Sequence, residues 1–217
     1  MALRVVTQPA SEPITLDETK LYLRVDTDAD DAMITALIVA AREYCQAYQN
    51  RAYITQTLEL TMDHFPGHRH FVDVWYQGMY SAHRHQRHHN EIKLLMPPIQ
   101  SVESISYTDH TGSTTTLDPS AYVVDIDSEP GRVVPAYGSP WPIVQLQPVN
   151  GVRVRYVAGY GGADAVPKSV KQAMQMLVAH WYENREAVIV SGYRPSVGAE
   201  IDFAVRALLS MERVIPT

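Results

Sequence analysis

The stretch DDAMITALIVAAREYCQAYQ, residues 30–49, carries the clearest secondary-structure signal in this chain of 217 residues. Its apolar residues recur at intervals of three and four positions, which predicts an amphipathic α-helix with one broad apolar stripe. Because the lone cysteine, Cys45, lies on this stripe, we expect it to be a buried core residue and not a nucleophile. The stripe consists of Met33, Ile34, Leu37, Ile38, Ala41, Tyr44, Cys45 and Tyr48.

A shorter helix is predicted ahead of this one, over residues 16–23. Thr15 and Glu18 have the spacing of a capping box, in which the threonine side chain accepts an amide hydrogen bond and the glutamate reaches back. The acidic run DTDAD, residues 26–30, then predicts a turn and the N-cap of the second helix, because carboxylates are favourable at a helix N-terminus.

After residue 54 the spacing of apolar residues changes to every second position, which predicts β-strands. In TQTLELTMD, residues 55–63, Leu58, Leu60 and Met62 alternate with polar residues, as in a half-buried strand. The region 55–158 therefore predicts an antiparallel β region with a poorly patterned insertion at 64–90. Turns rich in proline and glycine separate further short strands expected at 92–95, 101–108, 114–117, 121–126, 132–135 and 152–157.

Helical periodicity returns at Pro167, a residue favoured at the first helical position. A loop at 190–198 interrupts the pattern, and a last amphipathic helix is expected over 201–213. The order of helices, sheet and helices predicts an α+β fold. Its helical core, residues 1–54 and 164–217, is interrupted by an inserted antiparallel β-rich domain at 55–163.

The overall composition is that of an ordinary globular protein. The formal net charge is −6, so the surface as a whole does not resemble that of a nucleic-acid-binding protein. A single cysteine excludes an intrachain disulfide. Because the sequence shows no signal-peptide pattern and no apolar run of about 18 residues, we expect a soluble protein that is made in the cytoplasm and has no membrane partner.

Seven of the nine histidines lie between His64 and His89, in a segment whose three arginines and one aspartate give a formal charge of +2. Spacing makes His83, His85, His88 and His89 the best metal-ligand candidates. The neighbouring Gly, Gln, Arg, Ser and Asn residues are not typical of a built site, so we expect no physiological metal. The alternative is a loop that faces a DNA channel or a partner. Its candidates are His68, Arg69, His70, Arg84, His85, Arg87 and His88.

The segment from Gly159 to Ser169 imitates a phosphate-binding loop between a strand and a helix. Asp164 stands where a dinucleotide fingerprint needs its third glycine, and Pro167 replaces the second glycine of a P-loop. We therefore interpret the segment as a connector and predict no catalytic residue and no cofactor. Two alternatives stay open: an enzyme that binds a metal or nucleotide through this loop or the histidines, and a metal-dependent interaction module.

Several segments, taken in order, resemble the head–tail connector proteins (adaptor or head-completion proteins) of long-tailed phages, prophages and gene transfer agents. The resemblance covers nearly the whole chain except about residues 64–90. The segments are PITLDETKLYLRVDTDADDAMITALIVAAREYCQAYQNRAYITQTLEL (13–60), MPPIQSVESISYTD (96–109), AYVVDIDSEPGRVVPAYGSPWP (121–142), VRVRYVAGYGGADAVPKSVKQAMQMLVAHWYENREA (152–187) and FAVRALLSMER (203–213).

This resemblance implies a structural subunit of a ring, typically dodecameric, at the head–tail interface of a virion. The ring would lie beneath the portal protein, extend the DNA channel and provide a platform for stopper or tail-completion proteins. Double-stranded DNA would pass through without sequence-specific binding. Helices near 16–49 and 167–186 would build the ring wall, and β-region loops would face the channel or the tail side.

The resemblance also implies roles for particular C-terminal residues. Residues 190–217 become candidates for portal contact, and we expect 199–217 to be dispensable for folding of the core. The contact candidates are Phe203, Arg206, Leu209 and Arg213, and a structural motif is expected from Trp181, Tyr182, Asn184 and Arg185.

Overall fold

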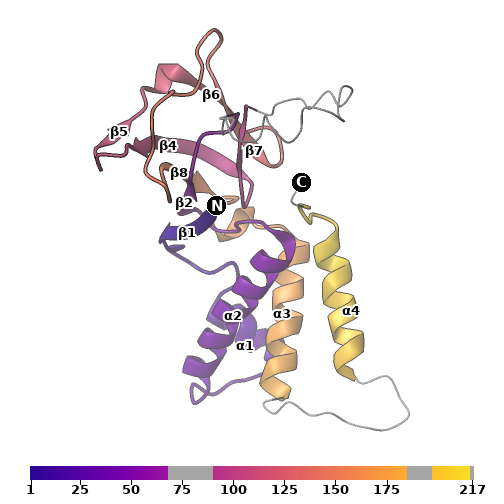
Figure 1. The fold of residues 1–217 in the computed structure, drawn as a ribbon. Coiled ribbons are helices and arrows are strands. Elements are labelled where there is room, and N and C mark those ends of the chain that lie inside the picture. The colour runs from indigo at the N-terminus through magenta and orange to yellow at the C-terminus, as the bar shows by residue number, and fades with distance from the viewer. Residues whose placement is uncertain (68–89, 185–196, 216–217) are drawn as a thin grey trace. The chain divides into compact units, whose positions relative to one another are not determined.

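The computed structural model describes residues 1–67, 90–184 and 197–215, which divide into two compact units (Figure 1). The β unit comprises residues 1–6, 57–95 and 99–157, and the helical unit comprises residues 7–56, 96–98 and 158–217. The expected boundaries differ from these at both ends of the β region. Residues 1–6 belong to the β unit because they form a strand, and residues 55–56, 96–98 and 158–163 belong to the helical unit.

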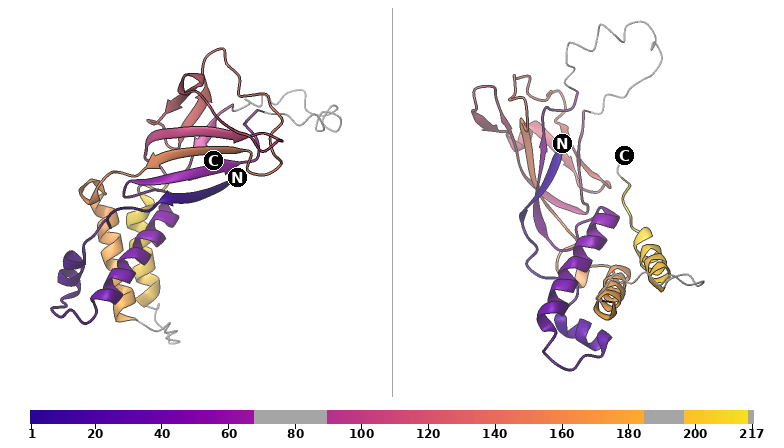
Figure 2. Two further views of the ribbon diagram at one scale, coloured as in Figure 1. Left: turned by 90° about the vertical axis from the view of Figure 1, so that its left-hand side faces the viewer. Right: turned by 60° about the horizontal axis from the view of Figure 1, so that its bottom comes forward.

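The helical unit contains α1 (Leu16–Leu23), α2 (Asp31–Gln49), α3 (Lys168–Glu183) and α4 (Val197–Ser210). Helix α3 lies between α2 and α4 (Figure 2). The stripe predicted for residues 30–49 faces these helices, and Cys45 is buried as expected. The buried apolar side chains of these three helices are Ile34, Ile38, Ala41 and Cys45 of α2, Val170, Ala173, Met174, Leu177 and Val178 of α3, and Val205 and Leu209 of α4.

The start of α1 follows the sequence prediction. The amide of Glu18 donates to Thr15 Oγ1 at 3.1 Å, and the amide of Thr15 donates to Glu18 Oε2 at 2.9 Å. These two reciprocal bonds form the predicted capping box, and they satisfy amides that have no partner within the helix.

The start of α2 does not follow the prediction, because the Asp30 side chain makes no capping bond to the helix. Asp30 Oδ2 instead accepts a hydrogen bond from the Tyr182 hydroxyl of α3 at 2.6 Å. The neighbouring Asp28 and Asp31 both pair with Lys20 of α1, at 2.6 and 2.7 Å. The acidic run therefore joins α2 to α1 and α3, and its capping role was overridden by tertiary contacts.

Helix α4 begins four residues before the predicted start and ends at Ser210, and the chain beyond it is held against the end of α2. The Val214 amide donates to the Gln49 carbonyl at 2.9 Å, which satisfies one of the last carbonyls of α2. We call Gln49, Asn50 and Arg51 the C-terminal clamp. Their side chains donate to the carbonyls of Leu209, Val214 and Glu212, respectively.

The expectation that residues 199–217 are dispensable for folding is wrong. Val205 and Leu209 are fully buried in the core of the helical unit. The buried side chain of Gln49 also has a partner in this segment, the Leu209 carbonyl at 2.7 Å. Removing the segment would leave apolar side chains of α2 and α3 exposed and buried polar groups without partners.

We predict that Leu209→Ala lowers the free energy of unfolding of the full chain by about 2–5 kcal/mol, the usual cost of a cavity left by a buried leucine. The matched control is Met211→Ala in the same segment, because Met211 is 73% exposed. Urea unfolding followed by far-ultraviolet circular dichroism measures both variants. Equal stabilities of the two variants would contradict this account of α4.

The β unit contains two sheets. The larger has the strand order β1-β2-β8-β4-β5, and the smaller has the order β3-β7-β6, with antiparallel pairing of β7 to both neighbours. All the strands predicted after residue 54 are present. The bounds are β1 (Ala2–Thr7), β2 (Gln56–Met62), β3 (Ile92–Leu94), β4 (Ile99–Thr108), β5 (Thr114–Thr116), β6 (Tyr122–Asp125), β7 (Gly131–Pro135) and β8 (Val152–Ala158).

Strand β2 buries a charged residue as well as its leucines. Glu59 alternates with the buried Leu58 and Leu60, yet it is itself only 4% exposed. Arg4 of β1 contacts Glu59 Oε1 at 2.6 Å, and Arg155 of β8 contacts Oε2 at 3.0 Å. Burial alone raises the pKa of Glu59, but the hydrogen bonds from Arg155 and Arg4 outweigh burial and hold the pKa below its ordinary value. This carboxylate therefore joins three adjacent strands.

We predict that Glu59→Gln weakens the pH dependence of stability. Since the folded pKa of Glu59 lies below the unfolded value of about 4.3, its ionised form stabilises the fold above that pH, and the stabilisation is lost as the pH falls through the folded pKa. Urea unfolding at pH 7 and at about pH 3 should show a smaller difference for the variant. Glu103→Gln, at an exposed site on β4, is the control and should keep the wild-type difference.

Candidate functional site

The two ends of the His-rich insertion are fixed by one tryptophan. Phe65 is buried and stacks on the Trp141 ring, with centroids 5.1 Å apart and an interplanar angle of 11°. The indole Nε1 of Trp141 donates to the Asn90 carbonyl at 2.9 Å. Tyr107 of β4 packs edge-on against Phe65 at 6.0 Å. Residues on both sides of the insertion therefore share one aromatic anchor.

Gly67 and Asn90 lie next to each other at the same place. A Cβ atom at Gly67 would approach Asn90 Oδ1 to 2.6 Å, and Gly67 has φ +80°, a conformation that favours glycine. We call Phe65, Gly67, Asn90 and Trp141 the stem. The stem was not predicted from the sequence, where its signal is a tryptophan between two prolines in a turn-rich segment.

The predicted residues of the insertion lie outside the described residues. This applies to the metal candidates His83, His85, His88 and His89 and to the loop candidates His68, Arg69, His70, Arg84, His85, Arg87 and His88. Within residues 1–67, 90–184 and 197–215, no group of three or more His, Cys, Asp or Glu side chains is arranged to hold a metal ion.

We predict that Trp141→Phe lowers the free energy of unfolding by about 1–3 kcal/mol, because the Asn90 carbonyl loses its donor while the ring stacking is retained. Trp141→Ala should cost about 3–5 kcal/mol, because the aromatic ring is lost as well. Equilibrium unfolding in urea measures both. Equal costs for the two variants would show that stacking on Phe65 contributes nothing.

The candidates for portal contact separate into two groups. Phe203 is 76% exposed, and Arg206 and Arg213 are also exposed. The Arg213 guanidinium lies over the Tyr48 ring at 4.7 Å from its centroid, so it also helps to hold the C-terminal segment. Leu209 is fully buried and is removed from the contact candidates, because its side chain is part of the helical core.

The expected structural motif lies at the end of α3. Trp181 packs edge-on against Tyr44 of α2 at 6.2 Å, and Tyr182 donates to Asp30. Asn184 Nδ2 donates to the His180 carbonyl at 2.9 Å, which satisfies a carbonyl in the last turn of the helix. Arg185 lies outside the described residues.

The glycine loop uses its backbone groups within the helical unit. The amide of Gly159 donates to the Pro98 carbonyl at 2.9 Å, and the Gly161 carbonyl accepts from Thr55 at 3.0 Å. A Cβ atom at Gly159 would come within 2.5 Å of the Ile54 carbonyl oxygen, and its φ of +126° also favours glycine. Close approach of two backbone segments therefore explains this glycine, and its amide is directed at a carbonyl and not at a phosphate.

Cys45 is unsuited to nucleophilic chemistry. Burial among the helices raises the pKa of its thiol to about 12, so the thiolate is not formed at neutral pH.

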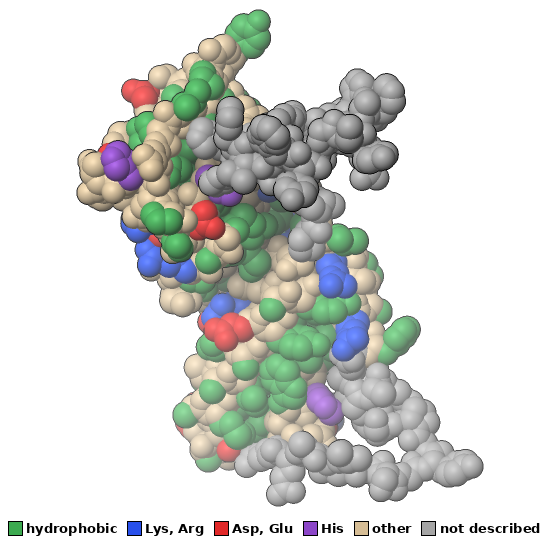
Figure 3. All heavy atoms as spheres, in the orientation of Figure 1, with side chains coloured by type: hydrophobic (Ala, Val, Ile, Leu, Met, Phe, Trp, Pro, Cys, Tyr) green, Lys and Arg blue, Asp and Glu red, His purple; other side chains and the backbone are tan. Residues whose placement is uncertain are grey.

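Charges of both signs are spread over the described surface. On the face drawn in Figure 3, Lys and Arg side chains lie in small groups, some with Asp or Glu beside them. Exposed Arg132 is paired with Asp125 at 2.9 Å, and the buried Arg42 is paired with Glu12 at 2.8 Å. Among the described residues, no helix is both long enough and apolar enough to cross a membrane.

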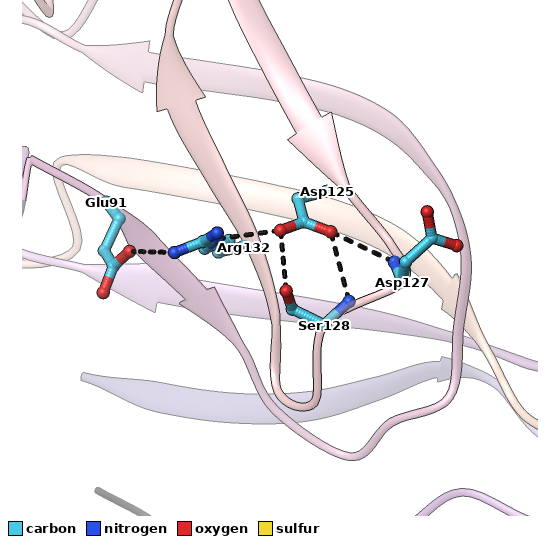
Figure 4. A network of polar contacts seen from close by, with 5 residues as sticks. All are labelled: Glu91, Asp125, Asp127, Ser128 and Arg132. Carbon is cyan, nitrogen blue, oxygen red and sulfur yellow. Dashed lines mark hydrogen bonds and ion pairs between the residues drawn. The ribbon is translucent and has the colours of Figure 1, made fainter.

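The β6–β7 hairpin carries a connected network of polar contacts (Figure 4). Asp125 accepts hydrogen bonds from the Ser128 hydroxyl at 2.7 Å, from Arg132 Nε at 2.9 Å and from the amides of Asp127 and Ser128. These bonds, led by the Ser128 hydroxyl and Arg132, lower the pKa of Asp125 to about 2. Arg132 also reaches Glu91 at 3.5 Å. The network fixes the hairpin and keeps its carboxylate ionised.

The fold is that of an α+β protein with a helical unit and a β unit of two sheets. A family model for head completion proteins matches residues 12–194 of the 217. The chain therefore belongs to the head completion protein family. A comparison with curated proteins finds no match.

Solved structures of gene transfer agent (GTA) particles have a similar fold. A chain in the neck of an empty GTA particle, computed with C6 symmetry, gives a TM-score of 0.74 at 20% identity. A chain in the virion of a native GTA particle gives 0.71, and one in the neck of a native particle, computed with C12 symmetry, gives 0.67, both at 20% identity. Each match covers 100% of this chain and 97% of the other.

Proposed function

We propose that this protein is a structural, non-catalytic head–tail adaptor, a ring subunit that lies beneath the portal at the head–tail interface of a virion. One observation carries the proposal: the chain belongs to the head completion family and shares its fold, over 100% of its length, with a chain of a GTA neck. The ring would extend the DNA channel and provide the docking platform for a stopper or tail-completion protein.

We propose a ring of twelve copies. The similar neck chains come from particles treated with C6 and C12 symmetry. A ring requires a head-to-tail contact in which two different surfaces of the subunit meet, and it closes only if the rotation per subunit fits a whole number of copies. Helix segments 16–49 and 167–186 are the proposed wall elements.

The charge of the subunit suits a conduit for DNA. Each phosphate that a protein neutralises adds salt-dependent affinity, so a ring of strongly basic subunits would hold DNA in place. This chain has a formal net charge of −6, and Arg4, Arg42, Arg132 and Arg155 are each paired with a carboxylate. We therefore propose passage of double-stranded DNA without sequence-specific binding.

The portal contact is proposed for the exposed face of α4 and the residues that follow it. Phe203 and Arg206 lie on that face, and Arg213 follows the helix. An exposed aromatic ring beside arginines has the composition of an interface anchor. The opposite side of α4 carries the buried Val205 and Leu209. One face of the helix therefore belongs to the core, and the other is exposed.

Deleting the coding sequence of this chain in the cell that makes the particle should leave heads without tails. Supplying the wild-type chain in trans should restore tailed particles, and Phe203→Ala should restore fewer while keeping the wild-type melting temperature, because Phe203 contributes little to the core. Met211→Ala is the control for an exposed apolar residue nearby. Electron micrographs count the particles, and normal numbers of tailed particles without the chain would refute the proposed function.

A further inference from the structure

One side of the larger sheet carries three arginines and a single carboxylate. Along β8 every second residue is fully buried, so Arg153 and Arg155, which alternate with the buried residues, project from the opposite side of the sheet. Arg4 of β1 lies on that side too, because Arg4 and Arg155 both contact Glu59 of β2. We call this side the basic face. The residues that define it are Arg4, Val6, Glu59, Arg153, Arg155 and Val157, with a formal charge of +2.

The positive charge of the basic face is accessible. The side chain of Arg4 is 65% exposed, whereas the Glu59 side chain beneath it is buried. Arg153 is exposed, and among the described residues it has no carboxylate partner. Val6 of β1 is 41% exposed on the same side, so the basic face offers apolar contact as well as charge.

The turn between β6 and β7 has the opposite charge. We call residues 126–130 the acidic turn. It contains no lysine or arginine, its carboxylates Asp127 and Glu129 are exposed, and Ile126 beside them is 43% exposed. The Asp125 carboxylate accepts hydrogen bonds from two amides of the turn, at 3.2 and 3.1 Å, and thereby holds its backbone (Figure 4). Side chains on a backbone fixed in this way lose less conformational entropy when they bind a partner.

We propose that the basic face of one copy of this chain binds the acidic turn of a second copy. Formal charges of +2 and −2 meet in this contact, and each surface adds an exposed apolar side chain, Val6 or Ile126. The apolar part favours a protein surface over the phosphates of DNA. The two surfaces differ and lie on different sheets of the β unit, as a head-to-tail contact requires. This inference rests on the proposed ring and adds a contact between the β units of neighbouring copies.

Charge reversal tests this contact. Heads purified from cells that lack the chain are mixed with increasing concentrations of purified subunit and sedimented, and quantitative immunoblotting measures the copies bound per head. Arg153→Glu and Asp127→Arg each bring like charges together, so half-saturation should need at least about tenfold more subunit. Both variants should keep the wild-type melting temperature, because both side chains are exposed.

Rescue identifies the second copy as the partner. The double variant, and an equal mixture of the two single variants, should bind heads to within about threefold of the wild type. In the mixture, the normal turn of one variant meets the normal face of the other, and the reversed turn meets the reversed face. Two controls should bind like the wild type: Arg153→Lys, which keeps the charge, and Glu103→Arg, which reverses an exposed charge on β4 outside both surfaces.

The outcomes distinguish this inference from the proposed function. Normal binding by either single variant overturns the contact, while saturable binding of the wild type to heads still supports the adaptor function. Loss by both variants without rescue in the mixture also overturns the contact, because the basic face would then meet DNA or a different neck protein. Failure of the wild type to bind heads refutes the adaptor function and this inference with it.

Discussion

The apolar stripe of α2 packs against α1 and, for the larger part, against helices that follow more than a hundred residues later in the chain. Ile34, Ile38 and Cys45 are fully buried because α3 and α4 return to cover them after the β unit has been completed. The ends of the β unit must therefore be brought back to the helical unit. The chain re-enters the helical unit next to Gly159, whose amide donates to the Pro98 carbonyl. A Cβ atom at this position would clash with the backbone of Ile54.

The packing of α4 against the helical core also fixes which face of α4 is exposed. Val205 and Leu209, four positions apart, face the core, and the carbonyls that follow accept hydrogen bonds from the C-terminal clamp. A helix fixed on one side in this way presents its other side in a defined orientation. The face that carries Phe203 is therefore pre-organised by the residues that stabilise the fold, which lowers the entropic cost of binding there.

The sequence was sufficient for features that depend on neighbours along the chain. The α2 stripe, the capping box of Thr15 and Glu18, and the strands after residue 54 follow from periodicity and local hydrogen bonding, and all are present. Tertiary contacts changed the rest. Asp30 has the residue type of an N-cap but bonds to Tyr182, which is 152 positions away. The clamp on the C-terminal segment and the stem at Trp141 also join distant residues, so local patterns could not indicate them.

The pairing of arginines lowers the attraction of the β unit for DNA, which suits the proposed role as part of a DNA channel. Arg4 and Arg155 share Glu59, and Arg132 is held between Asp125 and Glu91. An arginine in such a pair must give up its carboxylate before it can bind a phosphate, so its contribution to DNA affinity is reduced. The same pairs connect neighbouring strands. Contacts that stabilise the β unit thus also lower its attraction for DNA.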